Sequence, residues 1–193
     1  MGAITTLGNG LLAAQHRVDA LSVQEAELSM LRRLGASEER MLVVQANLAI
    51  TYGELGHLEK ALSMEQTVYY GRLKLKGKEH KDTLVAALNF ASTLNGLQRV
   101  KEVKSLLRRT IPVARSAHGE NNYLTLVLRG NYAKALYQDP SATLDDLNEA
   151  VTTLEDVERT ARRVLGGTHP LTTEIENTLR GTQAALRSRE TPW

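Results

Sequence analysis

Three asparagines that recur at a fixed interval could bind the main chain of another protein. Asn47, Asn89 and Asn131 are 42 residues apart, and each is followed by a large apolar residue and an alanine. A side-chain amide both donates and accepts hydrogen bonds, so a row of amides can pair with the backbone of an extended peptide, whatever side chains that peptide carries. The alternative is that each asparagine bonds a neighbouring helix end or loop.

The other residues that could do chemistry form no recognisable catalytic or metal-binding motif. The histidines are His16, His57, His80, His118 and His169. None has a second His, Asp or Glu at a metal-site spacing on the same predicted helix face, and no nucleophile stands beside a base in a known motif. We therefore predict that the protein is not an enzyme and uses no metal, cofactor or small-molecule substrate, with a site assembled in space left open. We expect His80 and His169 to cap or pack the links between helices.

The middle of the chain is basic, although the net charge of the protein is only +2. Residues 71–118 contain 11 basic and 3 acidic side chains, whereas residues 1–70 contain 5 and 8, and residues 119–193 contain 8 and 11. A basic region favours an acidic partner through its electric field. Nucleic acid is not indicated, because the region has no interleaved aromatic side chains. Its densest part, from Arg72 to Lys81, is either a groove edge or a solvated outer face.

Length and composition predict one folded domain in a reducing compartment. The chain has 193 residues, of which 42% are hydrophobic, and this is enough to bury a continuous core. It has no cysteine, so disulfides and thiolate metal sites are excluded, and we expect a cytoplasmic protein. No apolar stretch approaches the roughly 20 residues of a membrane span, and residues 1–6 lack the pattern of a secretory signal, so no membrane association is predicted.

The asparagines belong to an internal repeat that would position them. Glycines recur at the same interval, at Gly35, Gly77 and Gly119, each after a helical pattern that ends in basic residues or a histidine. Helix C-termini tend to end in this way. Inside each unit, apolar residues such as Leu48 and Tyr52 recur at helical spacing, so each unit predicts an antiparallel pair of helices.

The chain is therefore predicted to be an all-α array of helix pairs within a single repeat domain. We place a degenerate pair at 1–34, repeats at 38–77, 80–119 and 122–166, a capping helix at 170–187 and a tail at 188–193.

Three departures from the repeat give local predictions. Gln98 stands where the first copy has the turn glycine Gly56, so we expect a slightly shifted bend, made by the Asn-Gly pair just before it. In the third copy, five residues are inserted after Gln138, because the interval rises from 42 to 47. Pro112 lies inside a predicted helix and should kink it, since proline removes a backbone donor.

These motifs resemble the tetratricopeptide repeat (TPR). The first full copy reads Asn-Leu-Ala-x-x-Tyr from Asn47, then a turn glycine, Glu-Lys-Ala from Glu59, and Gly-x-x-His from Gly77. The 42-residue period and the Gly-x-x-His-Pro-x-Thr link from Gly166 resemble the long-helix version seen in kinesin light chains and related proteins. The resemblance implies an αα-superhelix, a TPR solenoid, in which the first helix of each pair lines a concave groove. In related repeats the Asn before the Leu-Ala pair binds peptide, and by position this role carries over to the three asparagines.

A helical wheel places each asparagine on a stripe opposite the core face. At about 100° per residue, Val43, Asn47 and Ile50 lie on one side of their helix, opposite Leu48 and Tyr52. The two faces of the helix must contact different surroundings. We therefore expect the face with Leu48 and Tyr52 to pack in the core and the asparagine stripe to line the groove. The asparagine stripe comprises Val43, Asn47, Ile50, Val85, Asn89, Ser92, Val127, Asn131, Lys134 and Gln138. Lys134 is expected to meet a carboxylate on the partner.

The sequence thus predicts a cytoplasmic adaptor or scaffold for another protein. We expect an extended, acid-containing peptide segment of that partner to lie in the concave groove. One alternative is a structural role in which the protein forms a homo-oligomer through its imperfect end repeats. Another alternative is a regulatory fragment of a larger protein.

Overall fold

The computed structural model of the protein describes residues 16–190, which form eight α-helices and no β-strand. The helices are α2 (Arg17–Arg33), α3 (Glu38–Glu54), α4 (Leu58–Lys76), α5 (Lys81–Gly96), α6 (Val100–His118), α7 (Tyr123–Gln138), α8 (Leu144–Leu165) and α9 (Pro170–Glu190). Residues 1–15 and 191–193 lie outside the described part, so the first helix that the sequence predicts for the pair at 1–34 is not described.

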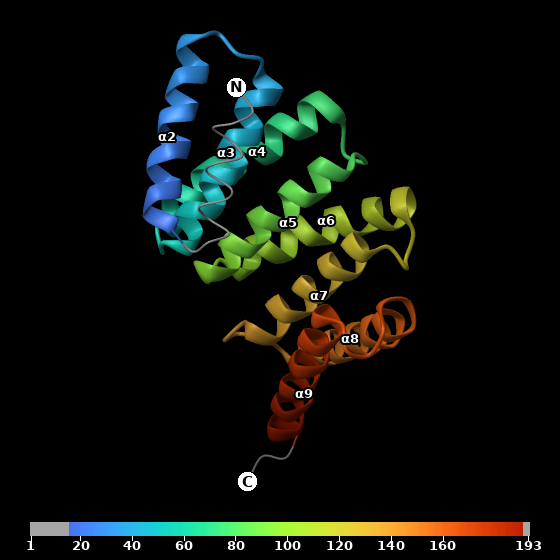
Figure 1. Ribbon diagram of the computed structural model, residues 1–193. Coiled ribbons are helices and arrows are strands. Elements are labelled where there is room, and N and C mark those ends of the chain that lie inside the picture. The colour runs from blue at the N-terminus through green and yellow to red at the C-terminus, as the bar shows by residue number, and fades with distance from the viewer. Residues whose placement is uncertain (1–15, 191–193) are drawn as a thin grey trace. The chain divides into compact units, whose positions relative to one another are not determined.

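The helices form two compact units of four described helices each. Unit 1 ends at Leu97 and contains α2 to α5, and unit 2 begins at Gln98 and contains α6 to α9. Figure 1 shows unit 1 in blue to green and unit 2 in yellow-green to red. The division falls between the two helices of the repeat that the sequence placed at 80–119.

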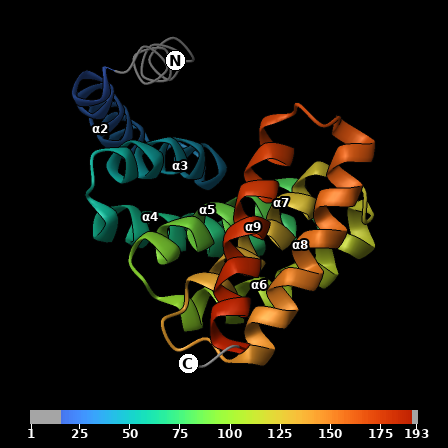
Figure 2. The same cartoon turned by 90° about the horizontal axis from the view of Figure 1, so that it is seen from below.

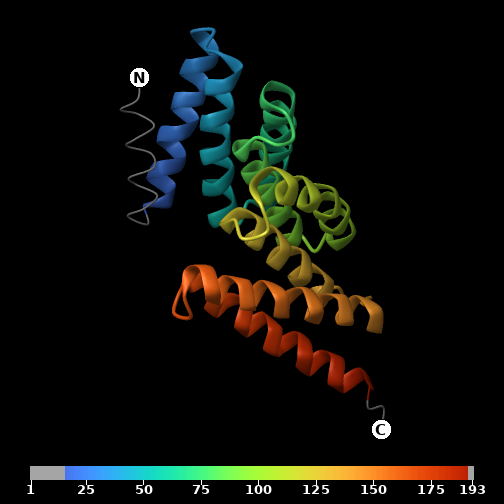
Figure 3. The same cartoon turned by 90° about the vertical axis from the view of Figure 1, so that its right-hand side faces the viewer.

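In unit 1, consecutive helices pack against one another, and α3 also contacts α5. Figure 3 shows α2 and α3 side by side. Leu48 and Tyr52 are buried, which confirms the predicted core face, and both belong to a cluster that includes Leu28 and Leu31 of α2. The hydroxyl of Tyr52 donates a hydrogen bond to the carboxylate of Glu25, and this bond raises the pKa of Tyr52 to about 12.

In unit 2, α6 to α9 also pack in chain order, and α7 contacts α9. The orange α8 and the red α9 lie side by side in Figures 2 and 3. The core between these helices is aliphatic, because Leu126, Leu136 and Leu154 are completely buried. α6 continues through Pro112 to His118, so the proline does not end that helix.

The links between repeats carry the predicted helix caps. The Nδ1 atom of His80 accepts a hydrogen bond from the backbone N–H of Asp82 at 3.1 Å, and His169 accepts one from Leu171 at 3.1 Å. In the link between these two, the side-chain oxygen of Asn122 accepts a hydrogen bond from the backbone N–H of Leu124 at 2.9 Å. These bonds satisfy donors that the first turn of a helix leaves unpaired. The expected capping role of the two histidines is therefore confirmed.

The expected shift of the bend at Gln98 is wrong. α3 ends two residues before Gly56, and α5 ends two residues before Gln98, so the two bends stand at equivalent positions. Gly56 has a φ of 80° and Gln98 a φ of 58°, so both residues adopt the left-handed conformation. This conformation is strained for glutamine, because its Cβ approaches the following carbonyl. The short connection between the two helices therefore overrides the local preference of the sequence.

The five inserted residues of the third copy are shared between a loop and a helix. The connection between α7 and α8 spans 139–143, compared with 97–99 between α5 and α6, and α8 has 22 residues where α6 has 19. A capping box between Thr143 and Asp146 begins α8. Lys104 of α6 lies 2.8 Å from Asp146 and holds the pKa of that carboxyl at about 2. At the other end, α9 continues to Glu190, beyond the predicted helix end at 187.

Candidate protein-binding surface

In unit 1, the asparagine stripe lies on the open side of α3 and α5. The side opposite the stripe is buried in the core, where Leu48 is only 1% exposed. On the stripe itself, Val43 is 42% exposed and Ile50 is 37% exposed. Asn47, Val85 and Asn89 are half-buried and Ser92 is exposed. The two helices contact each other.

The two amides of this stretch have no partner within residues 16–190. Among those residues, the side chains of Asn47 and Asn89 make no hydrogen bond. The Thr51 hydroxyl lies nearby but donates to the backbone carbonyl of Asn47, at 3.1 Å, and not to its side chain. Both side chains therefore keep all their donors and acceptors. A half-buried amide without a protein partner must bond water or a ligand.

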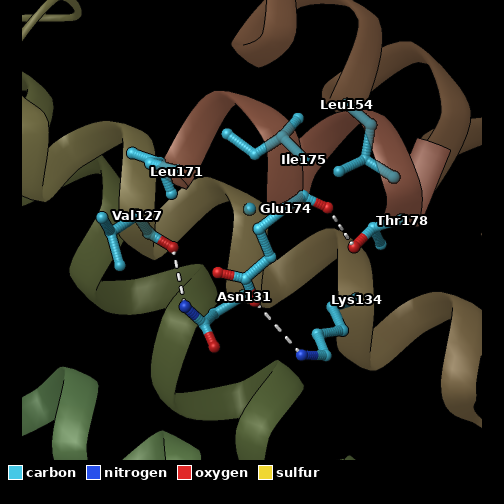
Figure 4. A pocket seen from close by; sticks show the side chains of 9 residues that line it. Val127, Asn131, Lys134, Leu154, Leu171, Glu174, Ile175 and Thr178 are labelled. Atoms are coloured by element: carbon cyan, nitrogen blue, oxygen red, sulfur yellow. Dashed lines mark hydrogen bonds and ion pairs between the residues drawn. The ribbon is translucent and has the colours of Figure 1, made fainter. Parts of the chain in front are cut away.

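In unit 2, three residues of the asparagine stripe line a cleft between α7 and α9. Val127, Asn131 and Lys134 form the α7 side of this cleft, which has a volume of about 40 Å³. Figure 4 shows the α9 side chains facing them. The remaining lining residues are Gly130, Leu154, Leu171, Glu174, Ile175 and Thr178. Gln138, the last stripe residue, is exposed at the end of α7.

The polar groups of this cleft are partly engaged. The amide of Asn131 donates to the backbone carbonyl of Val127 at 3.0 Å, and its second N–H and its side-chain oxygen have no partner among residues 16–190. Lys134 pairs with Glu174 at 3.4 Å, and the two side chains are 37% and 62% exposed. Figure 4 marks both interactions. The charge of Lys134 therefore already has a partner inside the protein. Such an exposed pair contributes about 0–1 kcal/mol, so a ligand could displace it.

Gly130 and the α9 residues of the cleft were missed by the sequence analysis. The link at Gly166 matches the link at Gly77 at an offset of 89 residues. The same offset places Glu174 at the position of Val85, which is part of the predicted stripe. Extending the repeat into α9 would therefore have found Glu174 and Thr178 of the cleft, but not Leu171 or Ile175. The hollow itself depends on packing and leaves no signal in the sequence.

Much of the charge between Arg72 and Lys81 is compensated inside unit 1. Lys76 lies 2.7 Å from Glu39 and 2.8 Å from Asp82. These hydrogen bonds raise the pKa of Lys76 and lower the pKa values of both carboxyls. Lys78 and Lys81 are exposed and form no ion pair within the described residues. They are the part of this segment that remains available to an acidic partner.

A second hollow, of about 600 Å³, lies in unit 1 away from the asparagine stripe. Met41 and Leu42 of α3 line it together with Tyr70 of α4, whose side chain is 52% exposed. Gly71 lets the two helices come close, because a Cβ there would lie 2.8 Å from both terminal methyl carbons of Leu42. This hollow is wide and open, in contrast to the narrow cleft of unit 2.

The described residues hold no cluster that indicates metal chemistry. No group of three or more His, Asp or Glu side chains between residues 16 and 190 could hold a metal ion. His57 packs edge-on against Tyr52, and His169 packs in the same way against Tyr123. No helix in the described part of the chain is both long enough and apolar enough to cross a membrane.

Comparison with known proteins identifies the fold. No protein-family model matches the sequence, and no curated protein matches it either. A solved structure of nearly identical TPR-like repeats, assigned as a kinesin light chain of Podosopora anserina, matches 97% of this chain and 88% of its own, with a TM-score of 0.78 and 21% identity. A point variant of those repeats matches with a TM-score of 0.80 and 20% identity over 97% and 87% of the two chains.

The fold is a TPR-like α-solenoid. The structure of BtubC (BKLC) from P. vanneervenii is a more distant match to this solenoid, with a TM-score of 0.64 and 12% identity over 98% of this chain and 80% of that one. The predicted fold class, an all-α repeat of the kinesin light chain-like type, is therefore confirmed. At these identities the similarity concerns the fold alone.

Proposed function

We propose that this protein is a protein-interaction module that binds an extended segment of a partner along its asparagine stripe. The observation that carries the proposal is that Asn47 and Asn89, on the open side of unit 1, have side-chain amides without a partner among residues 16–190. The exposed side chains of Val43 and Ile50 flank them. Amides can pair with the main chain of the segment, while the aliphatic side chains cover its apolar side chains.

The solenoid fold supports this proposal. Stacked helix pairs create long surfaces that suit extended ligands, and they do so without a catalytic centre. The part of the asparagine stripe in each unit would contact the bound segment separately. These contacts come from α3 and α5 in unit 1 and from α7, together with α9, in unit 2. A segment that bonds two amides gains about 1 kcal/mol from each hydrogen bond, and burial of its apolar side chains adds to this.

The partner segment is expected to contain acidic residues. The excess of basic over acidic side chains in residues 71–118, 11 against 3, supports this part of the proposal, as do the exposed Lys78 and Lys81. Attraction between exposed charges is screened by salt. Affinity should therefore fall as the ionic strength rises from low to physiological. An affinity that does not respond to salt would remove the basic region from the mechanism.

A random peptide library displayed on phage supplies the probe, because selection on the wild-type protein needs no natural partner. The selected peptides are synthesised, and their Kd values are measured by fluorescence anisotropy. The variant Asn47→Ala/Asn89→Ala should bind about 30-fold more weakly, because two hydrogen bonds are lost. Its melting temperature should not fall, because alanine favours a helix more than asparagine does.

Asn177→Ala is the matched control for these substitutions. Asn177 is an exposed amide on α9 that lies next to the stripe position Thr178 but does not line the cleft. Its replacement should leave peptide affinity unchanged. If the double variant binds like wild type, or loses stability while affinity is kept, the asparagines are structural and the proposal is wrong.

A further inference from the structure

The cleft between α7 and α9 exists where a helix lacks a side chain. Gly130 lies in the middle of α7, and a Cβ built on it would lie 3.8 Å from Cγ1 of Ile175, an ordinary contact distance. In the two preceding repeats the same position holds Ala46 and Leu88. The sequence of α7 therefore leaves open a space that a side chain fills in those repeats.

The floor of this cleft is apolar. Leu154 is completely buried, Ile175 is 3% exposed and Leu171 is 9% exposed. The cleft volume of about 40 Å³ exceeds the roughly 10–15 Å³ that one water needs. It is far below the roughly 150 Å³ of a cavity that holds benzene. The space therefore suits a methyl or isopropyl group better than an aromatic ring.

The rim of the cleft is polar and has no net charge. Lys134 and Glu174 carry opposite charges 3.4 Å apart. A charged ligand side chain placed here would meet one like charge and would have to break this pair. Asn131 keeps one N–H and its side-chain oxygen, so it can donate to and accept from the main chain of a residue that enters the cleft.

We infer that this cleft is a selectivity pocket for one small, uncharged, apolar side chain of the bound segment, of alanine to valine size or a proline. The inference rests on the proposed function, since it specifies which side chain of the bound segment unit 2 recognises. The peptide residue inserts its side chain over Ile175, and Asn131 pairs with its main chain. Each buried methylene of that side chain improves affinity about fourfold.

Filling the cleft tests this inference. Gly130→Leu should project its side chain into the cleft and weaken the selected peptides at least tenfold. Gly130→Ala removes part of the space and should weaken peptides that carry valine or proline more than peptides that carry glycine at the inserted position. Because alanine is more favourable than glycine inside a helix, the melting temperature of Gly130→Ala should rise. Lost affinity in a more stable protein cannot be attributed to unfolding.

Two controls make the result specific to the cleft. Gly53→Ala makes the same change near the end of α3 in unit 1, where the new Cβ would lie 4.0 Å from Ala61, and it should leave affinity unchanged. On the peptide side, the residue assigned to the cleft is replaced by phenylalanine, and affinity for the wild-type protein should fall at least tenfold. Replacement of neighbouring peptide residues by phenylalanine should have a smaller effect.

The outcomes separate this inference from the proposed function. Peptides that lose affinity on Asn47→Ala/Asn89→Ala, but bind Gly130→Ala and Gly130→Leu as tightly as wild type, would overturn the pocket and leave the asparagine stripe standing. The pocket would also be overturned if phenylalanine could be placed at every position of the selected peptides without loss of affinity. If the library yields no peptide that binds the wild-type protein, both the proposed function and the pocket are wrong.

Discussion

The two units of the solenoid use different chemistry at the same repeat positions. Between α4 and α5 of unit 1, Glu65 is buried beside Thr93, and one oxygen of its carboxylate has no partner among the described residues. In unit 2 the equivalent positions, 42 residues later, are Leu107 and Ala135, both completely buried. Burial raises the pKa of Glu65, and the hydrogen bond from Thr93 offsets this only in part. Unit 1 therefore contains an acid where unit 2 contains an apolar contact.

Unit 2, in turn, has ion pairs between helices whose basic side chains are largely buried. Arg129 of α7 is only 6% exposed and lies 2.6 Å from Asp156 of α8, whose pKa it lowers. Lys104 of α6 is paired with Asp146 of α8. The asparagine stripe also differs between the units. In unit 1 it presents two amides that have no partner among the described residues, whereas in unit 2 it presents an ion pair over a cleft. A repeat thus fixes the geometry of a position and leaves its chemistry free to vary.

Among substitutions that test this difference between the units, the largest change in unfolding free energy is expected at Arg129. Arg129→Ala removes a buried guanidinium together with its charged hydrogen bonds to Asp156 and Glu120, so the unfolding free energy should fall by about 2–3 kcal/mol. Urea denaturation followed by circular dichroism measures this loss. Arg162→Ala removes an arginine that is 55% exposed and pairs with Glu158 and Glu176, and it should cost clearly less than Arg129→Ala. Equal losses in the two variants would show that burial of Arg129 does not matter.

Making unit 1 resemble unit 2 should stabilise the protein. Glu65→Leu/Thr93→Ala installs the apolar pair of unit 2 and should raise the unfolding free energy at pH 8 by about 1–2 kcal/mol. A carboxyl with a raised pKa stabilises the fold fully below its unfolded pKa, near 4.5, and this contribution is lost as the pH rises through the folded pKa. The gain of the variant should therefore shrink toward pH 4.5. A gain independent of pH would contradict the role given to Glu65.

A smaller gain is expected from removing the strain at Gln98. Gln98→Gly matches the turn at Gly56 and should stabilise the protein by about 0.5–1 kcal/mol, because the relief of left-handed strain exceeds the entropy cost of glycine. The reverse change, Gly56→Gln, should destabilise by about 1 kcal/mol or more. Thermal melts of the two variants measure both effects. The same sign for the two changes would mean that this backbone conformation carries no strain.

The smallest effect is expected at the ion pair over the cleft. Lys134→Ala removes a pair that is exposed on both sides, so the unfolding free energy should change by less than about 0.5 kcal/mol. Because the pair is exposed, added salt should reduce that difference further. A loss well above this value in urea denaturation would show that the pair holds α7 and α9 together, and the stripe of unit 2 would then be structural.

Local patterns in the sequence were sufficient to predict the repeat fold and its links. The apolar spacing around Leu48 and Tyr52 identifies the core face, and the recurring link identifies His80 and His169 as helix caps. Gln98 could not be assigned correctly, because its left-handed conformation is imposed by the short connection between α5 and α6. Local propensity is a weak guide where the tertiary structure decides.

The cleft of unit 2 was beyond prediction for a related reason. Its position depends on how α9 packs after the insertion in the third copy, and its volume depends on a side chain that Gly130 lacks. The burial of Glu65 was equally hidden, since a polar residue on a predicted helix gives no sign that its neighbours exclude water. The asparagine stripe follows from the repeat in the sequence. That Asn131 bonds the carbonyl of Val127, unlike Asn47 and Asn89, is known only from the structure.

The most direct test of the account observes the asparagine amides themselves. Side-chain amide signals of the 15N-labelled protein are followed by NMR while a selected peptide is titrated to saturation. The account predicts that the signals of Asn47, Asn89 and Asn131 shift, because these amides form hydrogen bonds with the peptide, and that the signal of Asn177 stays in place. Saturation with shifts at Asn177 or elsewhere, and none at the three stripe asparagines, would contradict it.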